Sequence, residues 1–186
     1  MARDRERDHR ALPRLRGDVL RRPEGGPDIL KIDGVTHWSI PVNDLEEGER
    51  FYRDLLGLEY RGRLGNSRMA CFHVGGHDIL LCERKDKLYR TPQQDNRLHH
   101  SFTLAPQEWE KAVRVLHGRG VKIEELTYRE HGFFTGRELY FLDPSGNLLE
   151  VRDPTWKAGM ATPALEDIVG AGRQPRDAAG HRGPAR

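Results

Sequence analysis

Apolar and polar residues alternate with a period of two along several short stretches of the chain. Each half of the chain also contains one predicted helix among these stretches. In the first half, Val35 to Val42 alternates as a strand. Asn43-Asp44 then offers an N-cap, and apolar residues from Leu45 to Leu56 recur at helical spacing. Three more strands are predicted near residues 58–64, 69–74 and 78–83. The first half therefore predicts the order βαβββ.

The second half repeats this order. A helix is predicted from Pro106 to His117, with proline at its start and Gly118 at its end. The strands around it are predicted near residues 98–104, 121–127, 138–142 and 147–152. A repeat of this length indicates duplicated units that share a core. We therefore predict an α+β fold of paired βαβββ modules, about residues 32–84 and 97–153, within one domain at residues 28–157.

The two ends of the chain differ from this domain in composition. Residues 1–27 are rich in charged residues, Pro and Gly, and residues 158–186 are rich in Ala, Gly, Pro and Arg. Such segments bury too little apolar surface to offset the entropy of ordering. We predict a disordered basic N-terminal arm and a mostly disordered C-terminal tail.

The bulk properties exclude some partners and locations. The net charge of +2 demands no nucleic-acid partner, and no apolar run is long enough to span a bilayer. The N-terminus lacks the apolar core of a signal peptide. Cys71 and Cys82 lie in predicted strands and are interpreted as reduced packing residues. These features predict a cytoplasmic protein without a membrane or nucleic-acid partner.

One motif occurs twice, as HWSIPV at residues 37–42 and as HHSFTL at residues 99–104. Because side chains alternate along a strand, His37 shares a face with small residues, and the bulky apolar face is free to pack on a helix. The same parity directs His99 toward a cavity in the second copy. A register slip of one residue would present His100 instead.

A single carboxylate completes a candidate ligand set. Glu150 stands in a Leu-rich strand, where an unpartnered carboxylate is costly to bury. It is either a metal ligand or a rim carboxylate paired with Arg152 or another cation. With His37 and His99 it forms the two-histidine, one-carboxylate set of non-haem Fe(II) oxygenases, which leaves coordination positions open.

Two further motifs, FYRDLLGL at residues 51–58 and YFLDPSGN at residues 140–147, carry a family resemblance. They resemble the vicinal oxygen chelate superfamily, whose paired βαβββ modules surround a metal cleft. The resemblance covers roughly residues 32–156, and these two motifs are typical of the fold rather than of one chemistry.

Three other stretches resemble the catalytic module of type I extradiol catechol dioxygenases: GHDILL at residues 76–81, RLHHSF at residues 97–102, and HG at residues 131–132. This resemblance implies that His37, His99 and Glu150 hold the metal. It also implies catalytic roles for His77, His131 and Tyr140, of which the last two match the family's spacing to Glu150. The family usually has an extra residue after its His-His pair, so the choice between His99 and His100 stays open.

The resemblance implies an extradiol dioxygenase that inserts both atoms of O₂ into a catechol at an Fe(II) site, with Mn(II) as the alternative metal. We expect a homo-oligomer, and the cleft forms either within one chain or across a swapped dimer. The same scaffold serves three alternatives: a glyoxalase-like isomerase, a thiol transferase for an epoxide antibiotic, and a metal-free protein that sequesters a drug. Metal content and O₂ uptake would separate them.

Overall fold

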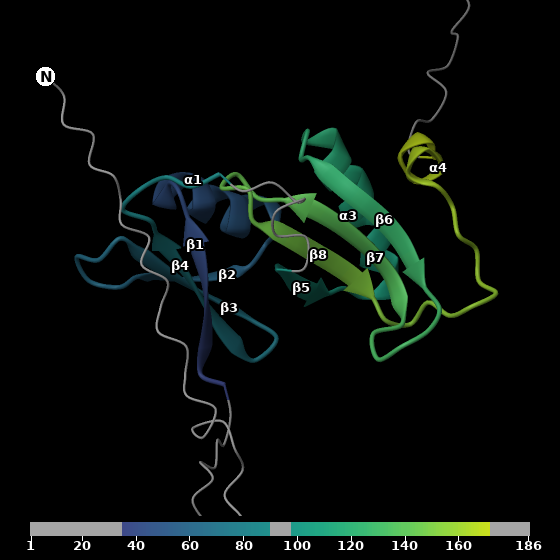
Figure 1. The fold of residues 1–186 in the computed structure, drawn as a ribbon, viewed down its shortest axis with the longest axis horizontal. Coiled ribbons are helices and arrows are strands. Elements are labelled where there is room, and N and C mark those ends of the chain that lie inside the picture. Colours follow the sequence, from purple (N-terminus) through teal and green to yellow (C-terminus); the bar gives the residue numbers. More distant parts are fainter. Residues whose placement is uncertain (1–34, 90–97, 172–186) are drawn as a thin grey trace, which may run out of the picture. The chain divides into compact units, whose positions relative to one another are not determined.

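Two modules of the same design make up the residues that the computed structural model describes, 35–89 and 98–171 (Figure 1). The elements of the first are β1 (His37–Val42), α1 (Leu45–Arg50), the π-helical turn η1 (Phe51–Leu55), β2 (Glu59–Arg63), β3 (Met69–Val74) and β4 (His77–Glu83). Those of the second are β5 (His99–Thr103), α3 (Pro106–Gly118), β6 (Ile123–Arg129), β7 (Gly136–Leu142), β8 (Leu148–Asp153) and α4 (Leu165–Gly170).

Each module forms one four-stranded mixed sheet. The strand orders are β1-β4-β3-β2 and β5-β8-β7-β6. The first strand of each module pairs in parallel with the last, and the other pairs are antiparallel. The predicted α+β fold of paired βαβββ modules is confirmed.

The predicted ends of the chain are only partly covered by the structure. The arm at residues 1–27 lies outside the described residues, and so does the end of the tail, residues 172–186. The described part of the tail, residues 158–171, contains α4, whose Ile168 is buried.

The first helical segment begins where the sequence predicts and then changes its hydrogen bonding. The Asp44 side chain caps α1 by accepting from the backbone N–H of Glu47 at 2.8 Å. The segment continues as η1, in which the Leu56 N–H donates to the Phe51 carbonyl, an i to i+5 bond. Phe51 and the adjacent Tyr52 are both buried at this turn. The predicted single helix, Leu45 to Leu56, is thus an α-helix followed by a π-helical turn.

The helices pack on one face of each sheet and share a continuous apolar core. Alternation along β1 buries Ile40 and Val42, while Trp109, at 0% exposure, anchors α3 against β8 through a hydrogen bond to the Val151 carbonyl. Because these strands bury one face against the helices, their opposite faces are left for other contacts.

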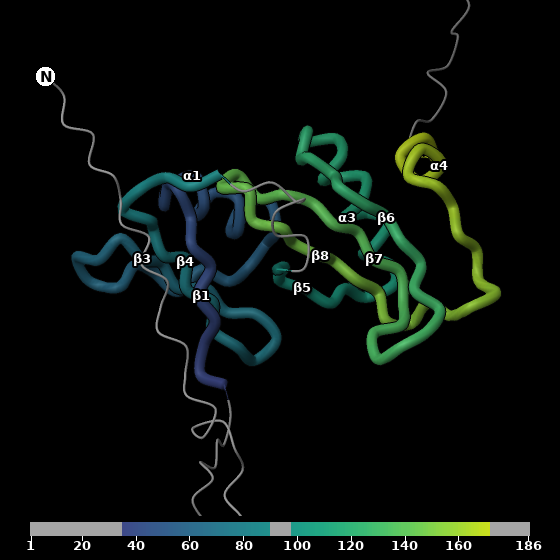
Figure 2. The backbone as a smooth tube through the Cα atoms, in the orientation of Figure 1, coloured from purple at the N-terminus to yellow at the C-terminus, as the bar shows by residue number. Residues whose placement is uncertain are grey.

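The turn between β7 and β8 joins the two modules. Its Ser145 hydroxyl accepts from the Asn43 N–H at 2.8 Å, and its Asp143 carboxylate accepts from the Tyr52 hydroxyl at 2.9 Å. Asn147 donates to the Pro41 carbonyl at 2.9 Å. The backbone trace shows this turn beside the start of α1 (Figure 2). These bonds fix the end of β1 against the second module.

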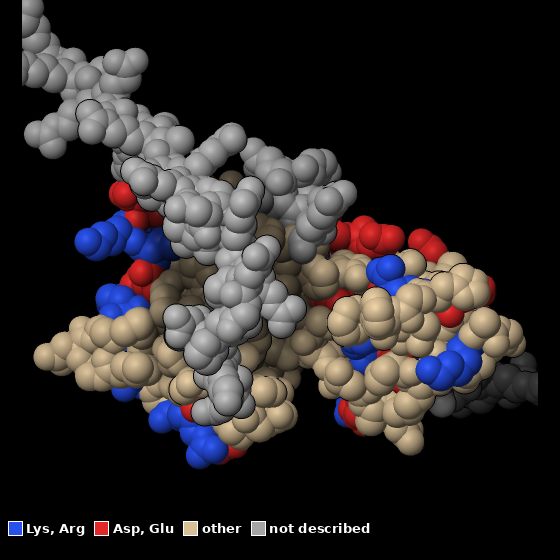
Figure 3. Space-filling model, turned by 60° about the horizontal axis from the view of Figure 1, so that its bottom comes forward, with Lys and Arg blue, Asp and Glu red and all other residues tan. Residues whose placement is uncertain are grey.

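None of the described helices is long and apolar enough to cross a membrane. On the face drawn in Figure 3, the described Lys and Arg side chains are interspersed with Asp and Glu side chains. Ion pairs between exposed side chains also occur on α3, where Lys111 lies 2.9 Å from Glu108.

Candidate functional site

His99 and Glu150 lie on neighbouring strands and face the same way. β5 and β8 run in parallel with Ser101 opposite Glu150, and His99 is two residues before Ser101 on the same face. The His99 Nε2 is 3.1 Å from the Glu150 Oε2. The Glu150 side chain is 5% exposed and that of His99 is 32% exposed. A nearly buried carboxylate is therefore aimed at a histidine that solvent still reaches.

A cavity of about 540 Å³ lies against this pair. His99, Tyr140 and Glu150 line it together with three charged residues, Arg129, Glu138 and Arg152. Ser101 and Thr103 also face it, and their small side chains leave it open. The cavity has the size of pockets that hold small molecules.

The charged groups of the cavity are paired with one another. Glu138, whose side chain is 2% exposed, accepts from the Arg129 guanidinium at 3.0 Å. The Arg152 Nε is 3.5 Å from the Glu150 Oε1, and another nitrogen of Arg152 donates to the Thr135 carbonyl at 2.8 Å. The negative charges of these two carboxylates thus offset the positive charges of the two guanidiniums on this side of the cavity.

Tyr140 adds a neutral hydroxyl to this wall. Its Oη donates to the Glu138 Oε2 at 3.1 Å. Burial, followed by the charges of Glu150 and Glu138, raises the pKa of Tyr140 to about 12. The hydroxyl consequently keeps its proton at neutral pH and can act as a donor.

The structure brings together four of the six predicted site residues. His99, His131, Tyr140 and Glu150 all line the cavity, although the His131 side chain is 91% exposed. His37 and His77 belong to the other sheet and do not line the cavity: His37 lies on β1 opposite Asp78, and His77 begins β4 opposite Val74.

The predicted metal triad is therefore not assembled within one chain. Across residues 35–89 and 98–171, no three His, Cys, Asp or Glu side chains gather in a way that could hold a metal ion. His99 and Glu150 supply two donors of suitable type, whereas a two-histidine, one-carboxylate site needs three. The donors among the described residues of one chain do not complete the site.

His100 points away from Glu150. It is opposite Leu149, the residue before Glu150, and so lies on the other face of the sheet. His100 lines a second pocket, of about 330 Å³, with Trp38 and Ile40, which His99 also borders. Burial lowers the pKa of His100. The strand parity used in the sequence analysis thus agrees with the orientation of His99 in the structure.

Sequence reasoning missed Arg129 and Glu138. Glu138 precedes Tyr140 by two residues in a predicted strand, so the shared face was a usable signal. Arg129 gave a weaker signal, because β6 extends to Arg129, beyond the predicted strand end at residue 127.

Comparisons with known proteins point to one family. The model of the family described as Glyoxalase/Bleomycin resistance protein/Dioxygenase superfamily matches residues 34–151. The chain is similar to "Glutathione transferase FosA" of Serratia marcescens, with 28% identity over 130 residues, which are 70% of this chain and 87% of that protein. It is also similar to "Metallothiol transferase FosB" of Staphylococcus epidermidis, with 24% identity over 70% of this chain and 89% of that protein.

Solved structures agree with the fold. An integron cassette protein from the mobile metagenome of Halifax Harbour sewage outfall is 26% identical and has a TM-score of 0.53, covering 66% of this chain and 99% of that one. A single-residue mutant of FosX, a fosfomycin resistance protein of Listeria monocytogenes, was solved with Mn(II) and 1S,2S-dihydroxypropylphosphonic acid. It is 22% identical and has a TM-score of 0.55, covering 66% of this chain and 93% of that one. At this identity the likeness shows the fold alone.

The prediction of an Fe(II)-dependent extradiol dioxygenase in aromatic catabolism was wrong. The curated relatives described above are named as thiol transferases, which agrees with the alternative of a thiol transferase for an epoxide antibiotic. The metal named with Listeria FosX is Mn(II), and nothing supports iron in particular. The predicted substrates, a catechol and O₂, are withdrawn together with the predicted dioxygenase activity.

The misleading signal has a structural cause. Tyr140 and Glu150 are directly opposite each other in the β7–β8 hairpin, so their ten-residue spacing reflects the hairpin of this fold. His131 lies in the loop before β7 with an exposed side chain, 3.9 Å from Glu130. The spacing that resembled a dioxygenase therefore describes topology and carries no information on ring cleavage.

Proposed function

The chain belongs to the Glyoxalase/Bleomycin resistance protein/Dioxygenase superfamily, and we propose that within it the chain is a metal-dependent transferase that adds a thiol to a small epoxide. The observation that carries this proposal is the His99–Glu150 pair, 3.1 Å apart at the wall of a 540 Å³ cavity. The names of the FosA and FosB relatives supply the reaction class.

The proposal includes a third ligand, His37, from a second copy of the chain. His37 and His99 occupy the same place in the repeated motif, and each stands on the sheet face that its own helix does not cover. Two copies that exchange these faces would bring His37 of one to His99 and Glu150 of the other. The expected homo-oligomer is thereby part of the proposal, because the site is incomplete without it.

A divalent cation held by two histidines and one carboxylate keeps open positions and supplies Lewis acidity to a bound oxygen. Mn(II) is the first metal to test. In thiol addition, a sulfur–carbon bond forms, one epoxide carbon–oxygen bond breaks, and the thiol proton ends on the released oxygen.

The residues of this chain would bind and orient the epoxide. Tyr140 keeps its proton at neutral pH and donates a hydrogen bond to Glu138, so it would donate one to an epoxide by turning from Glu138 to the ligand. Ser101 and Thr103 leave room beside His99. Arg152 and Glu138 hold the wall in one geometry through their mutual contacts with Arg129 and Glu150.

The test uses the purified full chain with Mn(II), a panel of low-molecular-weight thiols and a panel of epoxides that includes fosfomycin. Adduct formation is followed by mass spectrometry. We expect Glu150→Gln to lower the rate by more than about 100-fold, since even residues around a metal's ligands affect activity by 10- to 100-fold. Glu130→Gln, an exposed carboxylate of the same module outside the cavity lining, is the matched control.

Mixing two inactive variants tests the shared site. A mixed oligomer of His37→Ala and Glu150→Ala copies contains one intact site, formed by the unchanged His37 of the second variant and the unchanged Glu150 of the first. We expect activity to return on mixing. No return, with mixed oligomers shown by mass, would overturn the shared site, and adduct formation that ignores both Glu150→Gln and chelation would overturn the metal-dependent transferase.

A further inference from the structure

Both guanidiniums that line the cavity are already engaged by carboxylates of the same wall. The lining holds two guanidiniums, Arg129 and Arg152, and two carboxylates, Glu138 and Glu150. Glu138 alone lies 3.0 Å from Arg129 and 3.8 Å from Arg152. A phosphonate would have to compete with this buried carboxylate for both cations, and it would be repelled by the same group.

The mouth of the cavity is aromatic instead. Phe133 and Phe134 line it from the loop between β6 and β7 and are 101% and 68% exposed. Exposed apolar side chains that stand together beside a cavity indicate a binding surface. The Arg152 guanidinium lies 5.4 Å from the centre of the Phe134 ring, so this ring extends over the charged wall.

The loop that carries both rings has a fixed base. Gly136 has a φ of 146°, and a side chain there would place its Cβ 2.5 Å from the Asp153 carbonyl oxygen. Only glycine allows this close approach of the loop to β8. Phe133 and Phe134 are therefore presented to the cavity from an anchored segment.

We propose that the substrate of this cavity carries an uncharged aromatic substituent that packs on Phe133 and Phe134, in place of a phosphonate. This inference rests on the proposed function and names the class of its epoxide. Aromatic rings pack favourably edge to face or offset on one another. A neutral ligand also leaves the contacts of Glu138 with Arg129 and Arg152 intact. A cavity of 540 Å³ is in the range that holds drug-sized ligands.

Turnover provides the first test. With the same thiol and Mn(II), we expect kcat/KM for styrene oxide to exceed that for fosfomycin by at least about 10-fold. We expect Phe134→Ala and Phe133→Ala to lower the value for styrene oxide by about 10-fold and that for fosfomycin by less than about 2-fold. Tyr89→Ala is the matched control, because Tyr89 is an exposed aromatic residue outside this cavity.

Binding of inert ring-opened ligands separates this inference from the proposed function. Calorimetry compares 1-phenyl-1,2-ethanediol with 1,2-dihydroxypropylphosphonic acid, neither of which can be opened by a thiol. We expect the phenyl diol to bind at least about 10-fold more tightly and the phenylalanine variants to abolish the difference. If no epoxide reacts with a thiol but the chain still prefers the phenyl diol, the proposed transferase function is contradicted and the inference of an aromatic ligand is supported.

Glu138→Gln provides the converse test. This change keeps the shape of the side chain and frees Arg129 and Arg152 from a carboxylate, so we expect several-fold tighter binding of the phosphonate diol. A native preference for the phosphonate would overturn the inference. So would phenylalanine variants that weaken both ligands equally while dissociating the oligomer, because the rings would then serve the contact between copies.

Discussion

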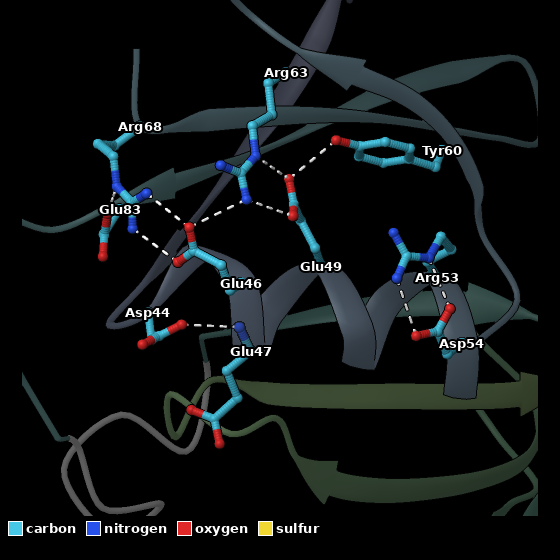
Figure 4. A network of polar contacts seen from close by, with 10 residues as sticks. All are labelled: Asp44, Glu46, Glu47, Glu49, Arg53, Asp54, Tyr60, Arg63, Arg68 and Glu83. Atoms are coloured by element: carbon cyan, nitrogen blue, oxygen red, sulfur yellow. Dashed lines mark hydrogen bonds and ion pairs between the residues drawn. The ribbon is translucent and has the colours of Figure 1, made fainter. Parts of the chain in front are cut away.

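In the first module, charged residues join α1 to the edge of its sheet, whereas in the second they line the cavity. Glu49 of α1 contacts Arg63, and Glu46 contacts both Arg63 and Arg68 (Figure 4). Tyr60 also donates to Glu49, and Arg68 pairs with Glu83. Glu46, Arg63 and Arg68 are exposed, whereas Glu49 is nearly buried beneath Arg63. In the second module, Glu138 and Glu150 are 2% and 5% exposed. The same topology therefore carries a surface ion network once and a buried charged wall once.

The registers of the two sheets show how the chemistry differs at equivalent places. Ser39 is opposite Leu80 in the first sheet, and Ser101 is opposite Glu150 in the second. Cys71 is opposite Leu80, where the second sheet has Tyr140 opposite Glu150. The repeat thus preserved the frame and one histidine per module, while one module alone acquired the carboxylate and the hydroxyl. In the proposed oligomer, the first module of one copy and the second module of another would form one site together.

The largest difference between the modules is expected in the free energy of unfolding when one arginine of each module is replaced. Arg137 is 13% exposed, lies 2.9 Å from the buried Asp153, and stacks 4.6 Å from the ring centre of Trp109. Arg137→Ala removes the partner of a buried carboxylate and should lower the free energy of unfolding by about 3 kcal/mol. Arg63→Ala, the matched change in the first module, should cost about 1 kcal/mol, because Arg63 is itself 39% exposed and its pair with Glu46 faces solvent. The nearly buried Glu49 would keep the hydrogen bond from the Tyr60 hydroxyl. Urea unfolding measures both, and equal losses would contradict the contrast.

A smaller difference in the free energy of unfolding is expected between two tyrosine variants of the first module. The Tyr52 hydroxyl donates to the buried Asp143 across the module boundary, and the Tyr60 hydroxyl donates to Glu49 within its own module. Tyr52→Phe should lower the free energy of unfolding by about 2 kcal/mol, because the hydrogen bond goes to a charged and buried acceptor. Tyr60→Phe should cost about 0.5 kcal/mol, since Glu49 keeps both bonds from Arg63. A Tyr52→Phe variant as stable as Tyr60→Phe would show that the boundary contact adds nothing.

The fold followed from periodicity because each module is built from local patterns. The strand predicted at residues 69–74 coincides with β3, and the helix predicted from Pro106 to His117 ends within one residue of α3. The change to π-helical bonding at Phe51 could not be predicted, because apolar spacing does not report which carbonyl an N–H selects.

The site was predicted less completely, for two physical reasons. Strand parity oriented His99 and Glu150, because alternation is a local property of one strand. The separation of His37 from them depends on how modules assemble, which no local pattern encodes. The reaction class was misread because the spacing of Tyr140 and Glu150 reflects a hairpin that the whole superfamily scaffold can share.

The smallest expected effect is on the pH dependence of stability, which should differ between Glu49 of the surface network and Asp143 at the module boundary. The hydrogen bond from Arg63 lowers the pKa of Glu49 below its ordinary 4.5, and burial raises the pKa of Asp143 above its ordinary 3.8. Glu49 therefore stabilises the folded chain above its unfolded pKa, and this stabilisation is lost as the pH falls through the lowered value. Asp143 acts in the opposite sense, because the folded state binds its proton more readily and gains stability as the pH falls through the raised value.

Thermal unfolding between about pH 7 and pH 3 should consequently separate two neutral variants. Glu49→Gln should make the loss of Tm on acidification shallower than in the unchanged chain, because the group whose stabilisation is lost has been removed. Asp143→Asn should make the loss steeper, because the group that gains stability has been removed. The two variants serve as controls for each other, since both replace a carboxylate by its amide. Changes of the same sign in both would mean that burial of Asp143 is not the dominant influence at the module boundary.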